Sequence, residues 1–394
     1  MQILLITNLY PPQELGGYGR SMADFAWGLM QSGHHVQVLC ANAPHLGEEG
    51  NGPSGEEVSR CLTLKGSFEG GLRIDRDPKR CADIDRINQK WIRHWLGRCQ
   101  WHGALVGNID LLGHEILHPL MDKGLPTVHH IGFVTPPFDP ALTPATTNYQ
   151  LVCASHAVKK SLIKAGMPIT GAPVVYPGAR VEMYGSHINM RSLPALPLPS
   201  KGDPLKICFA GIHMSSKGSI TLLAALAILK KRNIPTYCML AGELYQKTYA
   251  KEMHDLIEAE QLQNNVQFAP QLTRQQLSRF FMLHHVCVFP SIYPEAFGIV
   301  CAEAMASGLA LISSGVGGAA EIFEDGISGL SFKAGDSQSL AEKLEQLWRN
   351  PLLLEGLQKN GEQRIRGLFN VQNSAKALEA IFLNIQKKSN LSTP

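Results

Sequence analysis

The sequence predicts an α/β protein with two Rossmann-like domains, each built on a parallel sheet. Its 394 residues correspond to about two to three domains of roughly 150 residues. Short apolar runs alternate with amphipathic stretches in both halves, which is typical of βαβ units. A proline-rich stretch without periodicity at 186–204 predicts a linker between domains at 1–185 and 205–371. Residues 372–394 predict a helix that packs back on the first domain.

Composition excludes several classes of protein. Apolar residues make up 44% and charged residues 18%, which excludes a disordered chain. The net charge of +3 is too small to indicate a nucleic-acid-binding protein. Nine cysteines, an odd number without a CxxC pair, favour reduced thiols in the cytoplasm. Without an apolar run of about 18 residues or a signal-peptide pattern, we expect no membrane-spanning helix.

The first βαβ unit carries a candidate ligand loop. The apolar run 3–7 predicts a buried strand, and after the loop containing Gly16 and Gly17 an amphipathic stretch predicts a helix before a strand at 36–39. Parallel sheets bind ligands at the carboxyl ends of their strands, where this loop lies. Residues 44–75 show weak periodicity and predict a loop insertion or a hairpin.

The other expected elements continue the alternation. Strands are expected at 104–106, 127–131, 151–154, 206–209, 237–241, 266–268, 286–289 and 310–313. Helices are expected at about 110–123, 156–165, 219–230, 249–260, 274–282, 299–307, 338–348 and 372–388.

Two glutamates form the most informative motif. Glu295 and Glu303 have seven residues between them, the first in a loop after a strand and the second in a helix. Two such carboxylates can accept hydrogen bonds from several sugar hydroxyls, each contributing about 1.5–3 kcal/mol. The alternative is a pair of solvated glutamates near a helix end.

The segment PSIYPEAFGIVCAEAMASG resembles the E-x7-E signature of GT-B retaining glycosyltransferases of family 4, the glycogen synthase and sucrose synthase superfamily. The similarity extends to the first glycine-rich loop and to VVYPGAR, FAGIHMSSKG and GVGGAAEIFEDGISGLSF. It implies a GT-B fold whose domains face each other across a cleft. It also implies transfer of a hexosyl group from a nucleoside-diphosphate sugar, with UDP favoured, to an acceptor hydroxyl. No cofactor and no essential metal are implied.

The resemblance also implies roles for individual residues. Glu295 should contact hydroxyls of the donor sugar, Glu303 the nucleotide ribose, and Lys217 the diphosphate, whose charge grows as it leaves. Backbone amides that should approach the sugar and diphosphate belong to Phe297, Gly298 and Ile299, and glycines that should admit the phosphates are Gly211, Gly16 and Gly17.

One position departs from the family pattern. The residue after the glycine that corresponds to Gly211 is usually an arginine that binds the diphosphate, whereas this chain has Ile212. His213 or Arg20 could supply the missing cation. A catalytically silent sugar-nucleotide-binding protein and a GT-B sugar-nucleotide epimerase therefore stay open as alternatives, although the E-x7-E pair argues against the epimerase.

The resemblance implies a histidine at a strand end of the acceptor-binding domain. The chain offers His129 and His130, of which strand alternation lets one face the cleft. We select His130 as the catalytic candidate because its place in the alternation of the strand matches that of the family's histidine. An ungapped alignment instead places the family's histidine at Gly132. The alternative is a hydrogen-bonded core histidine.

Two sequence patterns that resemble metal-binding motifs are expected to bind no metal. His114 to His118 match H-E-x-x-H, but Pro119 follows at once and no third ligand is evident. The D-x-D patterns at 75–77 and 83–85 follow no convincing strand, so we interpret them as solvated acids.

A tryptophan-rich helix shows a clear stripe. Ile87, Trp91, Trp95 and Cys99 recur every four residues beside Lys90, Arg93 and Arg98. We expect this stripe to pack on the sheet, and peripheral contact with a membrane is the alternative. The acceptor stays open among a small molecule, a lipid-linked sugar and a glycan.

Overall fold

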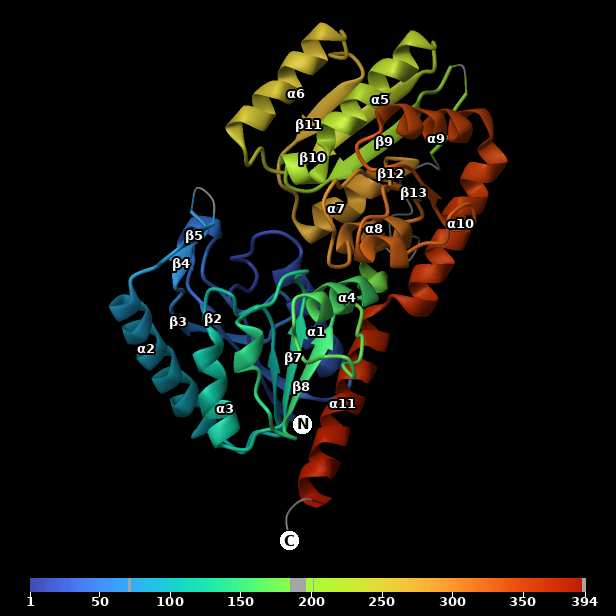
Figure 1. Ribbon diagram of the computed structural model, residues 1–394. Coiled ribbons are helices and arrows are strands. Elements are labelled where there is room, and N and C mark those ends of the chain that lie inside the picture. The colour runs from blue at the N-terminus through green and yellow to red at the C-terminus, as the bar shows by residue number, and fades with distance from the viewer. Residues whose placement is uncertain (70–71, 185–195, 201, 392–394) are drawn as a thin grey trace. The chain divides into compact units, whose positions relative to one another are not determined.

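Two parallel sheets organise the chain. The computed structural model describes residues 1–69, 72–184, 196–200 and 202–391, which form two units (Figure 1). The first unit comprises Met1–Gly178 with Val371–Pro394, and the second comprises Ala179–Asn370. The expected fold class, two α/β domains with parallel sheets, is confirmed. Within the expected linker, residues 186–195 and 201 lie outside the described residues.

The sheet of the first unit has the strand order β3-β2-β1-β6-β7-β8, with all neighbours parallel. Its strands are β1 (Gln2–Ile6), β2 (His35–Ala41), β3 (Glu57–Leu62), β6 (Gly103–Val106), β7 (Thr127–Ile131) and β8 (Tyr149–Cys153). Its helices are α1 (Tyr18–Gln31), α2 (Pro78–Leu96), α3 (His118–Asp122), α4 (His156–Lys164) and α11 (Val371–Leu391). The region expected as a loop or hairpin contains β3 and the antiparallel pair β4 (Gly66–Ser67) and β5 (Arg73–Ile74).

The C-terminal helix α11 belongs to the core of the first unit. Leu378 and Phe382 are fully buried among residues of α1 and the sheet. α1 approaches α11 so closely that a Cβ at Gly28 would lie 2.9 Å from the Ala375 Cβ. Ser374 Oγ also donates a hydrogen bond of 2.7 Å to the Tyr176 carbonyl. Apolar burial and one short helix contact thus fix α11 on this unit.

The second unit repeats the design. Its parallel sheet has the order β11-β10-β9-β12-β13-β14. The strands are β9 (Leu205–Ala210), β10 (Thr236–Ala241), β11 (Val266–Ala269), β12 (Val286–Phe289), β13 (Ala310–Ser313) and β14 (Leu330–Ser331). The helices are α5 (Ser219–Lys231), α6 (Lys247–Ala259), α7 (Arg274–Phe281), α8 (Ile299–Ala306), α9 (Ser337–Arg349) and α10 (Pro351–Leu368).

The expected packing of the tryptophan stripe is wrong. The buried residues of α2 are Ile84, Asn88, Ile92 and Leu96, so the helix faces the core one residue away from the expected stripe. Ile87 and Trp91 are 47% and 42% exposed. The polar Asn88 belongs to the buried face because its amide exchanges two hydrogen bonds of 2.8 Å with the Thr63 backbone.

Within the described ranges, no helix combines the length and the apolar character that crossing a membrane requires.

Candidate functional site

The strand order of the second unit marks a ligand site. β9 lies between β10 and β12. The chain continues from β9 to β10 and β11 on one side of β9, and then crosses to β12 and β13 on the other side. Ligands of open α/β sheets bind at such a switch point, beside the carboxyl ends of the strands. The loops that follow β9 and β12 carry Lys217 and Glu295, two of the residues for which the resemblance implies roles in donor binding.

Lys217 and Glu295 form an ion pair at this edge. The Lys217 Nζ lies 2.6 Å from Glu295 Oε1, and Ser291 Oγ donates a hydrogen bond of 2.5 Å to the same oxygen. The side chains of Lys217 and Glu295 are 29% and 16% exposed, respectively. Both ions therefore stay within reach of a ligand while the protein fixes their positions.

Backbone contacts between three loops position this pair. The Ile292 amide donates to the Ser216 carbonyl at 2.8 Å, which joins the loop after β12 to the turn that ends at Lys217. The Gly318 amide, from the loop after β13, donates to the Glu295 carbonyl at 2.7 Å. Two glycines permit the approach. A Cβ at Gly218 would lie 2.0 Å from the Pro290 carbonyl oxygen, and one at Gly317 would lie 2.4 Å from that of Glu295.

Helix α8 begins immediately after the Glu295 loop. Its N-cap, Gly298, has φ 100°, and no side chain caps the helix. The expected amides of Phe297, Gly298 and Ile299 lie at this end, where the helix dipole favours anions. The positive end of the helix thus lies in the same loop region as Glu295.

Glu303 lies deeper than its expected role suggests. Its side chain, on α8, is 1% exposed, and its Oε1 lies 3.8 Å from Arg274 Nε on α7. In this conformation Glu303 is a buried carboxylate with a basic neighbour, and a ribose could reach it only after the surrounding side chains move.

His213 does not supply the missing cation. Its ring is fully buried beside Phe209, with ring centroids 5.1 Å apart, and its Nδ1 lies 3.0 Å from Ser219 Oγ. Burial lowers the pKa of His213 to about 4. The imidazole is neutral near pH 7, so we correct the expectation that it replaces an arginine. The other candidate is Arg20 on α1, whose Nε lies 3.8 Å from Glu14 Oε1.

The first unit has its own switch point between β1 and β6. Asn8 follows β1, and its Nδ2 donates a hydrogen bond of 2.7 Å to Asp110 Oδ1 in the loop after β6. Gly16, with φ 70°, and Gly17 lead into α1. Tyr18, the first residue of α1, donates a hydrogen bond of 2.6 Å to the His130 carbonyl and so ties this loop to β7.

His129 and His130 are both fully buried in β7. The His130 Nε2 donates a hydrogen bond of 2.8 Å to the Val175 carbonyl. The His129 Nδ1 lies 2.6 Å from the Tyr149 hydroxyl. Burial lowers the pKa of His130 to about 4 and that of His129 to about 3. This geometry favours the alternative of hydrogen-bonded core histidines over direct contact with a substrate.

The metal-binding patterns have structural partners. Glu115 and Asp85 lie 3.0 and 2.7 Å from Lys65 Nζ, and Asp77 caps α2 by accepting from the Lys79 amide. The H-E-x-x-H segment is split between a 3-10 helix, His114–Leu117, and α3. Across the parts of the chain that the structure describes, no three histidine, cysteine or acidic side chains form a metal-binding group.

Three residues outside the candidates chosen from the sequence lie at these edges. Ser291 fixes Glu295, Arg274 lies beside Glu303, and Asp110 bonds Asn8. The sequence carried one weak signal, because Ser291 and Asp110 both follow expected strands by a few residues. Arg274 could not be paired with Glu303 from the sequence, since helix packing brings them together.

Comparisons with known proteins agree with this architecture. Residues 197–364 match the family model described as glycosyl transferases group 1. The structure of a glycosyltransferase from Rickettsia africae ESF-5 is similar with a TM-score of 0.79 and 17% identity, over 98% of each chain. The structure of Anabaena Alr3699/HepE in complex with UDP and glucose is similar with a TM-score of 0.76 and 18% identity, over 98% of this chain and 100% of that chain. The fold is GT-B.

A curated relative spans nearly the whole GT-B chain. The glycogen synthase of Mycobacterium tuberculosis (strain CDC 1551 / Oshkosh) is 23% identical over 400 residues, which covers 97% of this chain and 94% of the relative. Together with the family match of the second unit, this similarity supports a glycosyltransferase.

Proposed function

We propose that this GT-B chain is a retaining glycosyltransferase that moves a hexosyl group from a nucleoside-diphosphate sugar to an acceptor hydroxyl. The ion pair of Lys217 and Glu295 at the switch point of the second unit carries the proposal. UDP is the favoured nucleotide, and the similarity to Anabaena Alr3699/HepE, a protein solved in complex with UDP and glucose, supports this choice. No metal is essential in this proposal.

The pair can exchange partners when the donor binds. The diphosphate attracts the Lys217 ammonium, while the released Glu295 Oε1 keeps its hydrogen bond from Ser291 and accepts sugar hydroxyls. The uncapped start of α8 adds amide donors for the phosphates. Charge that grows on the leaving diphosphate is therefore met by one ammonium group and one helix dipole.

In this proposal the reaction proceeds on one face of the sugar. The bond between the anomeric carbon and the phosphate oxygen breaks, and the acceptor oxygen bonds to the same face of that carbon. The acceptor proton passes to the departing phosphate oxygen. Exclusion of water would prevent hydrolysis of the donor.

The first unit is proposed to bind the acceptor. Asp110 stands at its switch point, where a carboxylate can accept a hydrogen bond from the attacking hydroxyl. His130 is assigned a positioning role, because its Nδ1 lies 3.2 Å from the hydroxyl of Tyr18, the residue directly after Gly17. The acceptor class, a small molecule, a lipid-linked sugar or a glycan, depends on this unit.

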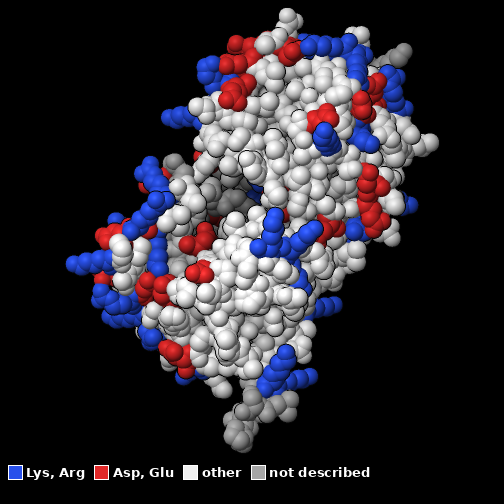
Figure 2. All heavy atoms as spheres, viewed as in Figure 1, with Lys and Arg blue, Asp and Glu red and all other residues white. Residues whose placement is uncertain are grey.

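Peripheral contact with a membrane from the cytoplasm is part of the proposal. Ile87 and Trp91 are exposed on α2, and Ile74 on the neighbouring hairpin is 59% exposed. Figure 2 shows basic side chains gathered over α2 and the β4–β5 hairpin, with acidic ones among them. Sedimentation with phosphatidylglycerol vesicles should decrease in Trp91→Ala and not in Leu352→Ala, a control at an exposed apolar residue of the second unit. Equal sedimentation would remove α2 from this role.

A thermal-shift panel tests the function. UDP, GDP, ADP and their hexose conjugates are compared, since a ligand of the folded state raises the melting temperature. A selective shift followed by nucleotide release that depends on an acceptor supports the transferase. A shift without transfer favours the silent binding protein, and interconversion of donor epimers favours the epimerase. Absence of any shift contradicts donor binding.

A further inference from the structure

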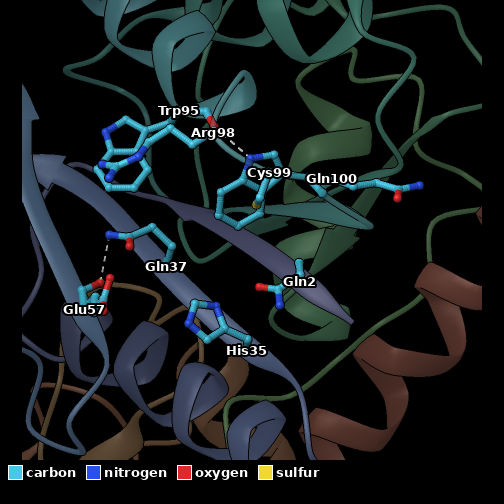
Figure 3. Close-up of a pocket in the computed structure, with 9 residues that line it drawn as sticks. Gln2, His35, Gln37, Glu57, Trp95, Arg98, Cys99 and Gln100 are labelled. Atoms are coloured by element: carbon cyan, nitrogen blue, oxygen red, sulfur yellow. Dashed lines mark hydrogen bonds between the residues drawn. The ribbon is translucent and has the colours of Figure 1, made fainter.

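A pocket lies at the edge of the first sheet opposite to Asp110. Its volume is about 490 Å³, within the range of small-ligand sites. Its walls come from the first residues of β1, β2 and β3, from the end of α2, and from the segment that leads to β6 (Figure 3). The lining residues are Gln2, His35, Gln37, Glu57, Trp95, Arg98, Cys99, Gln100 and Trp101. The amino ends of the strands form this edge, so the pocket is separate from the proposed acceptor site.

The aromatic walls are held in place. Trp101 Nε1 donates a hydrogen bond of 2.8 Å to the Trp95 carbonyl, which fixes the indole of Trp101 against the end of α2. The Arg98 guanidinium lies over the Trp95 ring, 4.4 Å from its centroid. Trp101 therefore presents a fixed apolar surface beside polar groups, while Arg98 covers one face of the Trp95 ring.

One lining residue is a buried hydrogen-bond acceptor. Gln37 is 2% exposed, and its Nε2 donates to the Glu57 carbonyl at 3.1 Å, a bond drawn in Figure 3, and to two further oxygens. All three bonds use the amide nitrogen. Among the described residues none donates to Gln37 Oε1, so this oxygen is available to a ligand in the pocket.

The chemistry of the lining selects the class of ligand. The amides of Gln2 and Gln100 can both donate and accept, and Gln37 Oε1 can accept, so the lining suits ligand hydroxyl groups. A phosphate-rich ligand would need several cations, whereas the lining contains one arginine, Arg98, together with the acidic Glu57. A wholly apolar ligand would cover Gln37 Oε1 without offering it a hydrogen-bond donor. A neutral molecule with many hydroxyls and one apolar face satisfies both the amides and the indoles.

We infer that this pocket binds a saccharide unit. Taken with the proposed function, on which this extension rests, the pocket would hold a glycan acceptor at a distance from the reacting hydroxyl. It therefore favours a glycan over a small molecule as the acceptor.

The inference is tested by binding without any donor. Maltotriose, cellotriose, chitotriose and, as a planar aromatic control, adenosine are titrated by calorimetry against the wild-type protein. At least one trisaccharide should bind, and Trp101→Ala should weaken it at least about tenfold, which equals 1.4 kcal/mol. The matched control is Trp91→Ala, an exposed tryptophan of α2 outside the pocket, which should bind as the wild type does.

Cys99 provides a second readout. It is a free, exposed cysteine in the lining, so a bound trisaccharide should slow its alkylation by N-ethylmaleimide, measured by peptide mass spectrometry. The Gln100→Ala variant should also weaken this protection, and because Gln100 is exposed the substitution leaves the core intact, so the test holds even if Trp101→Ala does not fold. The inference is overturned if no trisaccharide binds, if adenosine binds in their place, or if Trp101→Ala and Gln100→Ala bind sugar unchanged. Neither readout requires glycosyl transfer, so the outcome is independent of the proposed function.

Discussion

Lys217 and Glu295 illustrate how a charged pair can be stable and still available. In the free protein the two ions neutralise each other at 2.6 Å, and Ser291 fixes the carboxylate. A diphosphate offers Lys217 more negative charge than one carboxylate, while sugar hydroxyls offer Glu295 new donors. In the proposed function, the donor therefore replaces each member of the pair as the partner of the other.

The missing arginine leads to a prediction at residue 212. Ile212 is half-buried beside Gly211 at the end of β9, and His213 carries no charge near pH 7. Ile212→Arg should bring a second cation to the diphosphate and lower the Kd for the donor nucleotide by about tenfold, or 1.4 kcal/mol. Ile212→Gln, of similar length without charge, is the control. A weaker affinity in the arginine variant would mean that another group already fills the space.

Buried histidines predict a pH dependence of stability. The pKa of His130 is about 4 in the folded protein and about 6.5 when unfolded, so between these values the unfolded chain binds the extra proton. This contribution, about 3 kcal/mol, is complete above pH 6.5 and is lost as the pH falls toward 4. Denaturation of the first unit should therefore show a shallower pH slope in His130→Gln than in the wild type. Parallel slopes would contradict the assignment of His130 as a neutral core residue.

At the scale of elements, the loops after β9, β12 and β13 depend on two glycines. Gly218 has φ 71°, and any Cβ there would meet the Pro290 carbonyl at 2.0 Å. Gly218→Ala should lower donor affinity by about tenfold or more, because the turn that carries Lys217 must move. Gly308→Ala is the matched control, since Gly308 also has a positive φ, 84°, but has open space around its Cβ. Equal donor affinities in the two variants would contradict a role of the contact between Gly218 and Pro290 in donor binding.

Most strands could be predicted from their apolar runs, whereas the edge strands β3 and β14 and the helix α10 could not. Expected strands such as 286–289 and 310–313 match β12 and β13 because a strand buried on both faces is continuously apolar. α10 was missed, since glycines at 356, 361 and 367 interrupt its pattern. α2 was predicted with the wrong buried face, because Asn88 hides the true periodicity. β3 has mixed polarity at the sheet edge and gave no signal.

The same contrast applies to the candidate site. Lys217 and Glu295 could be selected from motifs, and the fold brings them together through contacts between residues 78 positions apart. The burial of Glu303 and His213 could not be predicted, because it depends on helices and strands distant in sequence. For His130, a buried core position was one of the two alternatives that the sequence left open. Ser291 and Asp110 became candidates only when the strand order showed where the carboxyl ends meet.

For the whole molecule, α11 links the end of the chain to the stability of the first unit. Phe382 is fully buried, so Phe382→Ala should destabilise that unit by about 3–5 kcal/mol. Calorimetry should show a lower melting temperature for the first unit and an unchanged one for the second. The neighbouring Leu383 is 44% exposed, and Leu383→Ala should leave both transitions in place. If the melting temperatures of both units fell together in Phe382→Ala, the two units would unfold in one cooperative transition.

Calorimetric titration of the donor tests the central claim most directly. A nucleoside diphosphate and its hexose conjugate, with UDP and UDP-glucose first, are titrated into the wild type, Lys217→Ala, Glu295→Gln and the exposed control Lys251→Ala, whose lysine pairs with Asp255 elsewhere on the surface. We predict that Lys217→Ala weakens both ligands at least about tenfold, that Glu295→Gln weakens only the hexose conjugate, and that the control binds normally. Wild-type affinity for both ligands in Lys217→Ala and Glu295→Gln would contradict a donor site at this pair.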